Sequence, residues 1–124
     1  MSVSPNNSEP HEVPQPPLNL DVSMPELTRA LLDYESVSGN EQPIADAVHT
    51  ALSFCPHLHL TRDGDAIIAR TEFPPLPGAK GERTRIILAG HLDTVPLPTV
   101  EGSLGTVPST VREEEDGCVL YGRG

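Results

Sequence analysis

Two stretches of the chain carry apolar residues at helical spacing, and the first is "SMPELTRALLDYE" at residues 23–35. Ser23 and Glu26 stand at the spacing of a capping box. Pro25 falls in the first turn, where a missing N–H leaves no helical hydrogen bond unmade. One face of the predicted helix then collects the apolar side chains Leu27, Ala30, Leu31 and Tyr34. This pattern predicts a helix that begins after Ser23.

The second helical pattern lies in "VSGNEQPIADAVHTALSFCP", residues 37–56. Either Ser38 or Asn40 is suited to cap this helix, Pro43 again falls in the first turn, and Pro56 ends it. The apolar face consists of Ile44, Ala47, Val48, Ala51 and Leu52.

Alternating patterns predict two β-hairpins. In "HLHLTRDGDAIIAR", Leu58 and Leu60 alternate with polar residues, Asp63-Gly64 provides a turn, and the apolar pair Ile67-Ile68 follows. The stretch "VREEEDGCVLYG" likewise gives two short strands around Asp116-Gly117. Between the hairpins, "TRIILAGH" at residues 84–91 is apolar on both faces, which is typical of a buried central strand. Two helices beside such a sheet indicate an α/β fold.

The amino-terminal segment differs in composition. It carries prolines at positions 5, 10, 14, 16 and 17 among polar residues, and it has little apolar surface to bury. We therefore expect residues 1–22 to form a disordered tail and residues 23–124 to form one folded unit.

Charge and composition narrow the possible partners and location. The formal net charge of −10 argues against nucleic acid or an anionic membrane as a partner. No stretch is long and apolar enough to span a bilayer, and the start lacks the basic and apolar segments of a secretory signal. Cys55 and Cys118 are then expected to be reduced thiols, and the protein to be cytoplasmic.

His91 and Asp93, at the end of the predicted central strand, are the main candidates for chemistry. Side chains two positions apart on an extended segment point to the same side. A neutral imidazole is a common metal ligand, and a neighbouring carboxylate orients it. The same pair is also compatible with a simple hydrogen-bonded surface contact, because a zinc site needs at least three protein ligands and only one is evident.

A family resemblance supports the interpretation of His91 as a metal ligand. "GHLDTVP" at residues 90–96 resembles the first metal-site motif of the M20 family of metallo-aminoacylases and peptidases. "LYGRG" at 120–124 resembles the start of the second motif, and "SVSGNEQPIADAV" resembles the segment that leads into a helix. Together with "LTRDGDAIIAR", these motifs most resemble the sequences of the succinyl-diaminopimelate desuccinylases of actinobacterial type. The resemblance implies the incomplete N-terminal part of a two-zinc aminopeptidase-like catalytic domain, with helices packed on a mixed sheet.

The resemblance also assigns roles to residues. His91 corresponds to a ligand of one metal in a centre of two Zn²⁺ (or Co²⁺), and Asp93 to the aspartate that orients this ligand and is often called catalytic. The aspartate that bridges the metals is expected as the third residue after Gly124. The glutamate pair, a further acidic ligand and a distal histidine have no counterpart in the sequence. The chain is therefore expected to be a truncated fragment with no activity by itself.

The implied parent enzyme hydrolyses the amide of N-succinyl-LL-2,6-diaminopimelate to succinate and LL-2,6-diaminopimelate, in lysine and diaminopimelate biosynthesis. It is expected to be a homodimer that acts on a small molecule. The alternatives are an acetylornithine deacetylase or M20 peptidase, or a non-catalytic truncated remnant.

Other polar clusters are weaker candidates for a site. Glu113–Glu115 precede Gly-Arg-Gly, whereas the family's glutamate pair follows it, so a solvated charge run is expected. His57 and His59 alternate with leucines on a predicted strand and are expected to be exposed. His49, Cys55 and Cys118 lack the spacing of a metal site.

Overall fold

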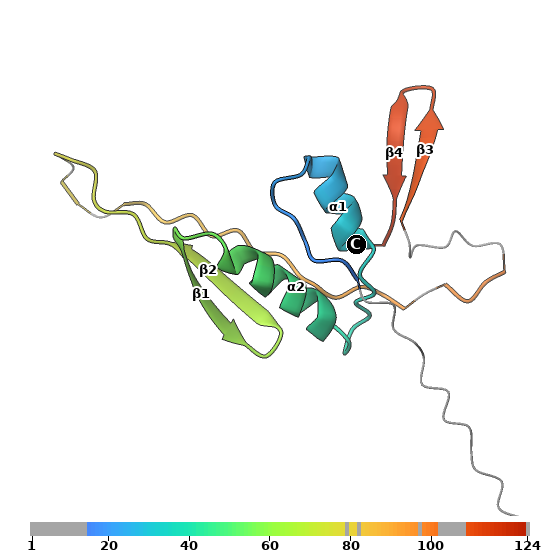
Figure 1. The fold of residues 1–124 in the computed structure, drawn as a ribbon, viewed down its shortest axis with the longest axis horizontal. Helices are drawn as coiled ribbons and strands as arrows, with labels where there is room; N and C mark the ends of the chain where they lie inside the picture. Colours follow the sequence, from blue (N-terminus) through green and yellow to red (C-terminus); the bar gives the residue numbers. More distant parts are fainter. Residues whose placement is uncertain (1–14, 79, 82, 97, 102–108, 124) are drawn as a thin grey trace, which may run out of the picture.

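The computed structural model describes residues 15–78, 80–81, 83–96, 98–101 and 109–123, and it contains two helices and two hairpins within them (Figure 1). The helices are α1 (Met24–Leu32) and α2 (Gln42–Ser53). The strands are β1 (Leu58–Asp63), β2 (Ala66–Thr71), β3 (Thr110–Glu114) and β4 (Gly117–Tyr121). The predicted α/β class is thus confirmed. Within the described residues, neither helix combines the length and apolarity that crossing a membrane requires.

Helix α1 begins at the predicted capping box. The Ser23 backbone N–H donates to Glu26 Oε2 at 3.0 Å, and the Glu26 N–H donates to Ser23 Oγ at 3.4 Å. The Ser23 hydroxyl also donates to Glu26 Oε2 at 2.6 Å. This hydrogen bond is the largest cause that lowers the pKa of the Glu26 carboxyl, followed by the one from the Ser23 N–H. Pro25 lies in the first turn, as predicted. The start of α1 is therefore fixed by its own local sequence.

Part of the predicted amino-terminal tail contacts the turn that follows this helix. Residues 1–14 lie outside the described residues, but residues 15–22 follow a defined path. The Tyr34 hydroxyl donates to the Pro16 carbonyl at 3.0 Å, and Tyr34 is buried. Burial raises the pKa of this phenol. Proline has no backbone N–H, so a proline-rich segment forms few backbone hydrogen bonds within itself. Here the hydroxyl of buried Tyr34 provides a hydrogen bond that holds the segment.

Helix α2 packs on the first hairpin (Figure 1). The capping prediction was wrong, because α2 begins after Glu41, and neither Ser38 nor Asn40 occupies the cap position. The buried residues of α2 are Ile44, Ala45 and Ala51. An ion pair between Arg62 of β1 and Asp46 of α2, at 2.6 Å, adds to this contact.

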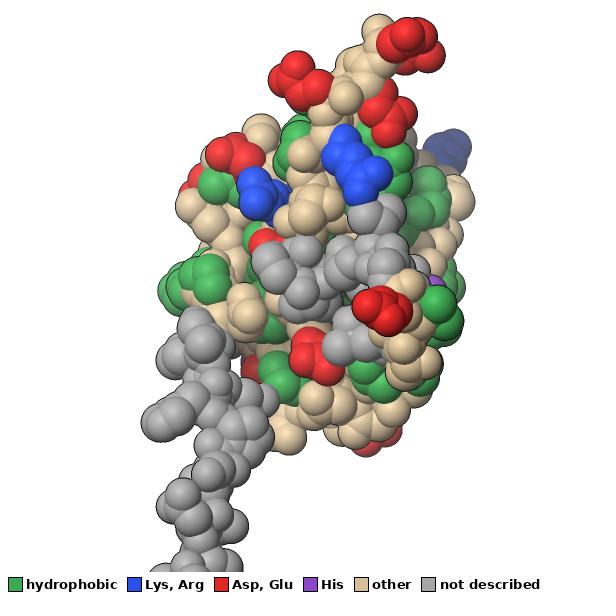
Figure 2. Space-filling view, turned by 90° about the vertical axis from the view of Figure 1, so that its right-hand side faces the viewer, with side chains coloured by type: hydrophobic (Ala, Val, Ile, Leu, Met, Phe, Trp, Pro, Cys, Tyr) green, Lys and Arg blue, Asp and Glu red, His purple; other side chains and the backbone are tan. Residues whose placement is uncertain are grey.

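Both predicted hairpins are confirmed as antiparallel pairs. In the first, Asp63 pairs with Ala66, so the two loop residues are Gly64 and Asp65. Gly64 has φ 57°, a left-handed conformation that glycine adopts without steric cost. In the second, Glu114 pairs with Gly117. The space-filling view shows acidic side chains at the end of the molecule formed by this hairpin, where residues 113–116 are exposed (Figure 2).

The predicted central strand is the main departure from expectation. Residues 84–91 are extended but pair with no strand of the described chain, and the two hairpins form separate sheets instead of one mixed sheet. Ile86, Ile87 and Leu88 are 82%, 82% and 93% exposed. An apolar run becomes a buried strand only where strands flank it and helices cover it. Among the described residues, α2 packs on β1 and β2, whereas Ile86, Ile87 and Leu88 stay largely exposed.

The capping box gives a first prediction. Ser23→Ala is expected to destabilise α1 by about 1 kcal/mol, since a helix N-cap hydroxyl contributes roughly that much. The pKa of the Glu26 carboxyl is lower in the folded chain than in the unfolded chain. Glu26 therefore stabilises α1 fully above its unfolded pKa, and this stabilisation is lost as the pH falls through its folded pKa. Cα chemical shifts of α1 during an acid titration measure both effects. Ser23→Asp, which keeps a capping oxygen, is the control, and an unchanged α1 in Ser23→Ala would contradict the role of the cap.

The exposed apolar run gives a second prediction. Unpaired extended backbone with apolar side chains promotes pairing with another copy of the chain. We expect concentration-dependent association, and we expect Ile87→Lys to reduce it because a charge opposes such pairing. Analytical ultracentrifugation measures the effect, and Val111→Lys, at an exposed position on β3, is the control. Equal association of Ile87→Lys and the wild-type chain would show that this segment is not responsible.

Candidate functional site

A short backbone contact brings two distant segments together at the candidate site. Val37 and Thr94 form an isolated parallel bridge. The Thr94 N–H donates to the Ser36 carbonyl at 2.8 Å, and the Ser38 N–H donates to the Thr94 carbonyl at 3.1 Å. Ser36 is only 1% exposed. We call this contact between residues 36–38 and Thr94 the backbone bridge. It fixes the segment that carries His91 and Asp93 against the chain between α1 and α2.

Asp93 lies between two polar side chains at this bridge. Its Oδ2 accepts a hydrogen bond from the Ser38 hydroxyl at 2.6 Å, and its Oδ1 lies 3.2 Å from His91 Nδ1. The Ser38 hydrogen bond is the largest cause that lowers the pKa of the Asp93 carboxyl, and the charge of a protonated His91 lowers it further. The carboxylate is therefore favoured in its ionised form.

The hydrogen bonding of His91 defines its tautomer. Nδ1 lies 2.9 Å from the main-chain oxygen of Asp93, which can only accept, so Nδ1 is assigned as the donor. In the neutral ring, Nε2 then carries the lone pair. The His91 side chain is 72% exposed, so this nitrogen is open to a ligand. The ring has the protonation pattern of a metal-ligating histidine whose other nitrogen is held in place.

The segment after β4 contacts the same region. Arg123 is buried, and its Nη1 donates to the Val95 carbonyl at 2.6 Å. Gly122 lies against Leu32 of α1 so closely that a Cβ on it would be 2.7 Å from Leu32 Cδ1. Ser109 N–H donates to Asp33 Oδ1 at 2.6 Å. Within the described residues, the two motifs contact each other through Arg123 and Val95, and Gly122 of the second motif lies against the end of α1.

The remaining candidates lie outside this site. His57 stacks on Phe73, with ring centroids 6.3 Å apart, and His59 lies 4.0 Å from Glu72, where both side chains are exposed. Cys55 and Cys118 are free thiols. Glu114 accepts a hydrogen bond from the Tyr121 hydroxyl at 2.7 Å within the second hairpin. None of these contacts involves His91 or Asp93.

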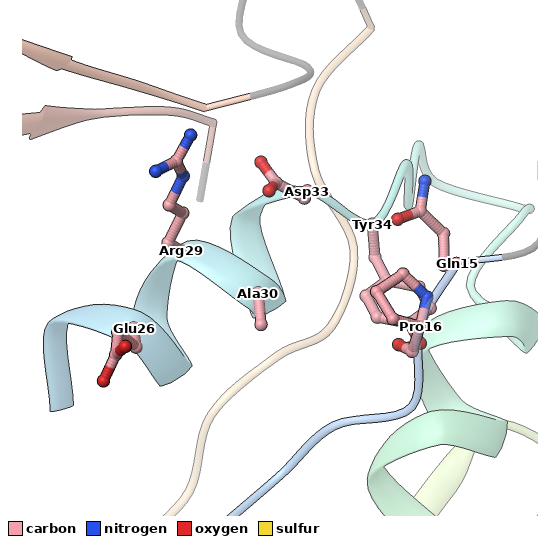
Figure 3. Close-up of a pocket in the computed structure, with 7 residues that line it drawn as sticks. All are labelled: Gln15, Pro16, Glu26, Arg29, Ala30, Asp33 and Tyr34. Atoms are coloured by element: carbon pink, nitrogen blue, oxygen red, sulfur yellow. The ribbon is translucent and has the colours of Figure 1, made fainter. Parts of the chain in front are cut away.

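A pocket occurs elsewhere, beside α1 (Figure 3). Its lining residues come from the described amino-terminal segment and from α1 with the turn after it: Gln15, Pro16, Glu26, Arg29, Ala30, Asp33 and Tyr34. The close-up shows Tyr34 beside Pro16, with Glu26 and Arg29 farther along α1. Since His91 and Asp93 do not line it, this pocket is not part of the candidate site.

Ser38 is the member of the site that the sequence did not identify. Its sequence context suggests only a helix cap, and its partner Asp93 is 55 residues away. A serine shortly before a helix gives no local signal for such a distant contact. His91 and Asp93, by contrast, are close enough in sequence for their proximity to follow from the spacing alone.

Comparison with known proteins finds relatives that are named as desuccinylases. Residues of the chain are 40% identical over 97 positions to proteins of Mycobacterium tuberculosis strains CDC 1551 and H37Rv, which are provisionally named succinyl-diaminopimelate desuccinylase DapE. They are 37% identical over 100 positions to the succinyl-diaminopimelate desuccinylase of Corynebacterium glutamicum. The predicted similarity to succinyl-diaminopimelate desuccinylases of actinobacterial type is thus confirmed.

The similarity covers much of this chain but little of its relatives. The matches take in 75% to 79% of the chain and 22% to 23% of the relatives' own length. No family model matches the chain, and no solved structure matches it.

The residues present do not make a complete metal site. Within the described part of the chain, no group of three or more His, Cys, Asp or Glu side chains is placed to hold a metal ion. His91 offers one nitrogen, and Asp93 is engaged with Ser38 and His91. A two-zinc centre requires several further ligands, so His91 and Asp93 correspond at most to one ligand of such a centre and the partner that orients it.

The close approach of Gly122 to Leu32 yields a prediction for this region. Gly122→Ala is expected to destabilise the chain by about 1–3 kcal/mol, because the added Cβ overlaps Leu32. Urea unfolding followed by circular dichroism measures the change. Gly90→Ala is the matched control, since a Cβ there meets nothing within 4 Å. Equal stability of the two variants would contradict the close packing of Gly122 on Leu32 of α1.

Proposed function

We propose that this chain is part of a metal-dependent amidohydrolase of the M20 family that removes succinate from N-succinyl-LL-2,6-diaminopimelate. The reaction yields LL-2,6-diaminopimelate for diaminopimelate and lysine biosynthesis. The substrate is a small molecule, and we further propose a cytoplasmic, homodimeric enzyme with two Zn²⁺ or Co²⁺ ions. Homology to desuccinylases supports the reaction, although the chain spans about 23% of their length.

The contact between His91 and Asp93 is the structural observation that supports the proposal. His91 presents Nε2 to the exterior while its Nδ1 is held by Asp93, and this is how proteins commonly orient a metal-binding imidazole. In the proposed enzyme, His91 supplies one nitrogen ligand. Asp93 acts through His91 as a positioning residue by fixing the ring and its tautomer. Both residues belong to the segment that resembles the family's first metal-site motif.

The same arrangement limits what the 124 residues do alone. A single imidazole binds zinc weakly, because protein sites for this ion use three or four ligands. We therefore propose that these residues do not hydrolyse the substrate by themselves, and that catalysis depends on further ligands and a general base.

The activity is tested on the complete product of the gene, after its coding sequence has been determined beyond the codon for Gly124. We expect release of succinate from N-succinyl-LL-2,6-diaminopimelate. Asp93→Asn is expected to lower kcat/KM about 10- to 100-fold, as is usual for partners of metal ligands, and His91→Ala is expected to lower it further. His59→Ala, at an exposed histidine on β1, is the matched control and should keep full activity. No succinate release by the wild-type product would overturn the proposal.

Metal binding by the 124-residue chain is a separate prediction. Calorimetric titration with zinc is expected to show only weak uptake, because one histidine cannot complete a site. Tight, stoichiometric binding that disappears in His91→Ala would mean that this chain alone contains further ligands. Binding that persists unchanged in His91→Ala would place the zinc elsewhere.

A further inference from the structure

We propose that Ser38 is a positioning residue of the site, whose hydroxyl holds the Asp93 carboxylate in the orientation that supports His91. This inference rests on the proposed function, in which His91 is a ligand and Asp93 its partner. It extends the site from the motif at 90–96 to a residue in the segment between α1 and α2.

The geometry at the carboxylate is the first argument. The two oxygens of Asp93 have different partners, because Oδ2 accepts from Ser38 Oγ at 2.6 Å and Oδ1 lies 3.2 Å from His91 Nδ1. An aspartate side chain without a hydrogen-bond partner rotates about its Cα–Cβ and Cβ–Cγ bonds. The hydrogen bond from Ser38 restricts this rotation and keeps Oδ1 directed at the imidazole.

The second argument is that Ser38 is itself held in place. Its N–H donates to the Thr94 carbonyl at 3.1 Å, and the Thr94 N–H donates to the Ser36 carbonyl at 2.8 Å. Ser38 therefore contacts the 93–94 segment through both its main chain and its side chain. A hydroxyl on a fixed backbone loses little entropy when it binds, which makes it an effective orienting group.

A local structural role does not account for this serine. Helix α2 begins after Glu41, so the Ser38 side chain does not cap it. The hydrogen-bond partner is 55 positions away, which excludes the short-range turns in which serine commonly bonds neighbouring backbone. Its contact with Asp93 instead connects two segments that would otherwise be joined only by backbone hydrogen bonds.

The test uses NMR spectroscopy on the 124-residue chain and needs no hydrolytic activity. It compares the wild-type chain with Ser38→Ala, which removes the hydroxyl, and Ser38→Thr, which retains one. Ser53→Ala is the matched control, because the Ser53 hydroxyl also makes a 2.6 Å hydrogen bond, to the Thr50 carbonyl at the end of α2. Hα–Hβ couplings report the rotamer of Asp93, and ¹⁵N shifts at one pH where the ring is neutral report the tautomer of His91.

We expect a single Asp93 rotamer and an Nδ1–H tautomer of His91 in the wild-type chain. Ser38→Ala is expected to give averaged Asp93 couplings, whereas Ser38→Thr restores the wild-type couplings and Ser53→Ala leaves them unchanged. The Nδ1–H tautomer of His91 is expected to persist in all variants, because the main-chain oxygen of Asp93 lies 2.9 Å from Nδ1 and can only accept. Averaged Asp93 couplings in the wild-type chain would overturn the proposal without any variant. It would also be overturned if Ser38→Ala kept the wild-type couplings, or if Ser53→Ala disturbed the site equally. Because none of these results depends on succinate release, a failure here is distinguishable from a failure of the proposed function.

Discussion

The backbone bridge between residues 36–38 and Thr94 is the contact on which the candidate site depends. Each partner segment lacks the length to form a sheet, and two hydrogen bonds of 2.8 and 3.1 Å join them. On one side of this bridge, the Tyr34 N–H donates to the Leu31 carbonyl of α1 at 3.2 Å, and the Tyr34 hydroxyl donates to the Pro16 carbonyl at 3.0 Å. On the other side, Arg123 holds the carbonyl of Val95. Without the bridge, His91 and Asp93 would lie on an extended segment with few other contacts.

The chemistry of the site follows from what this bridge places together. It brings together the Ser38 hydroxyl, the Asp93 carboxylate and the His91 imidazole. Nδ1 of the imidazole is engaged by Asp93, and the His91 side chain is largely exposed. Such a set orients one ligand but does not complete a metal site. The homology to desuccinylases over less than a quarter of their length is consistent with this partial set. The proposal of a shared catalytic centre therefore concerns the complete enzyme and not these residues alone.

The sequence predicted the elements whose causes are local. The capping box of Ser23 and Glu26, Pro25 in the first turn and both hairpins depend on residues a few positions apart, and all are found. The proximity of His91 and Asp93 also follows from their spacing. The failures concern long-range packing. The apolar run at 84–91 predicts a central strand, but burial of that run depends on neighbouring strands, and its own sequence does not specify them. The sequence offers Ser38 or Asn40 as the cap of α2, and nothing in the residues around Ser38 indicates its distant partner Asp93.

Amide hydrogen exchange at Ser38 and Thr94 tests the central claim most directly. Both N–H groups donate in the backbone bridge, while the backbone of residues 86–88 has no partner strand in the described chain. If the bridge holds the site together, the amides of Ser38 and Thr94 exchange more slowly than those of Ile86, Ile87 and Leu88 under the same conditions. Equally fast exchange at all five positions would contradict the account, because the segment carrying His91 and Asp93 would then have no fixed attachment.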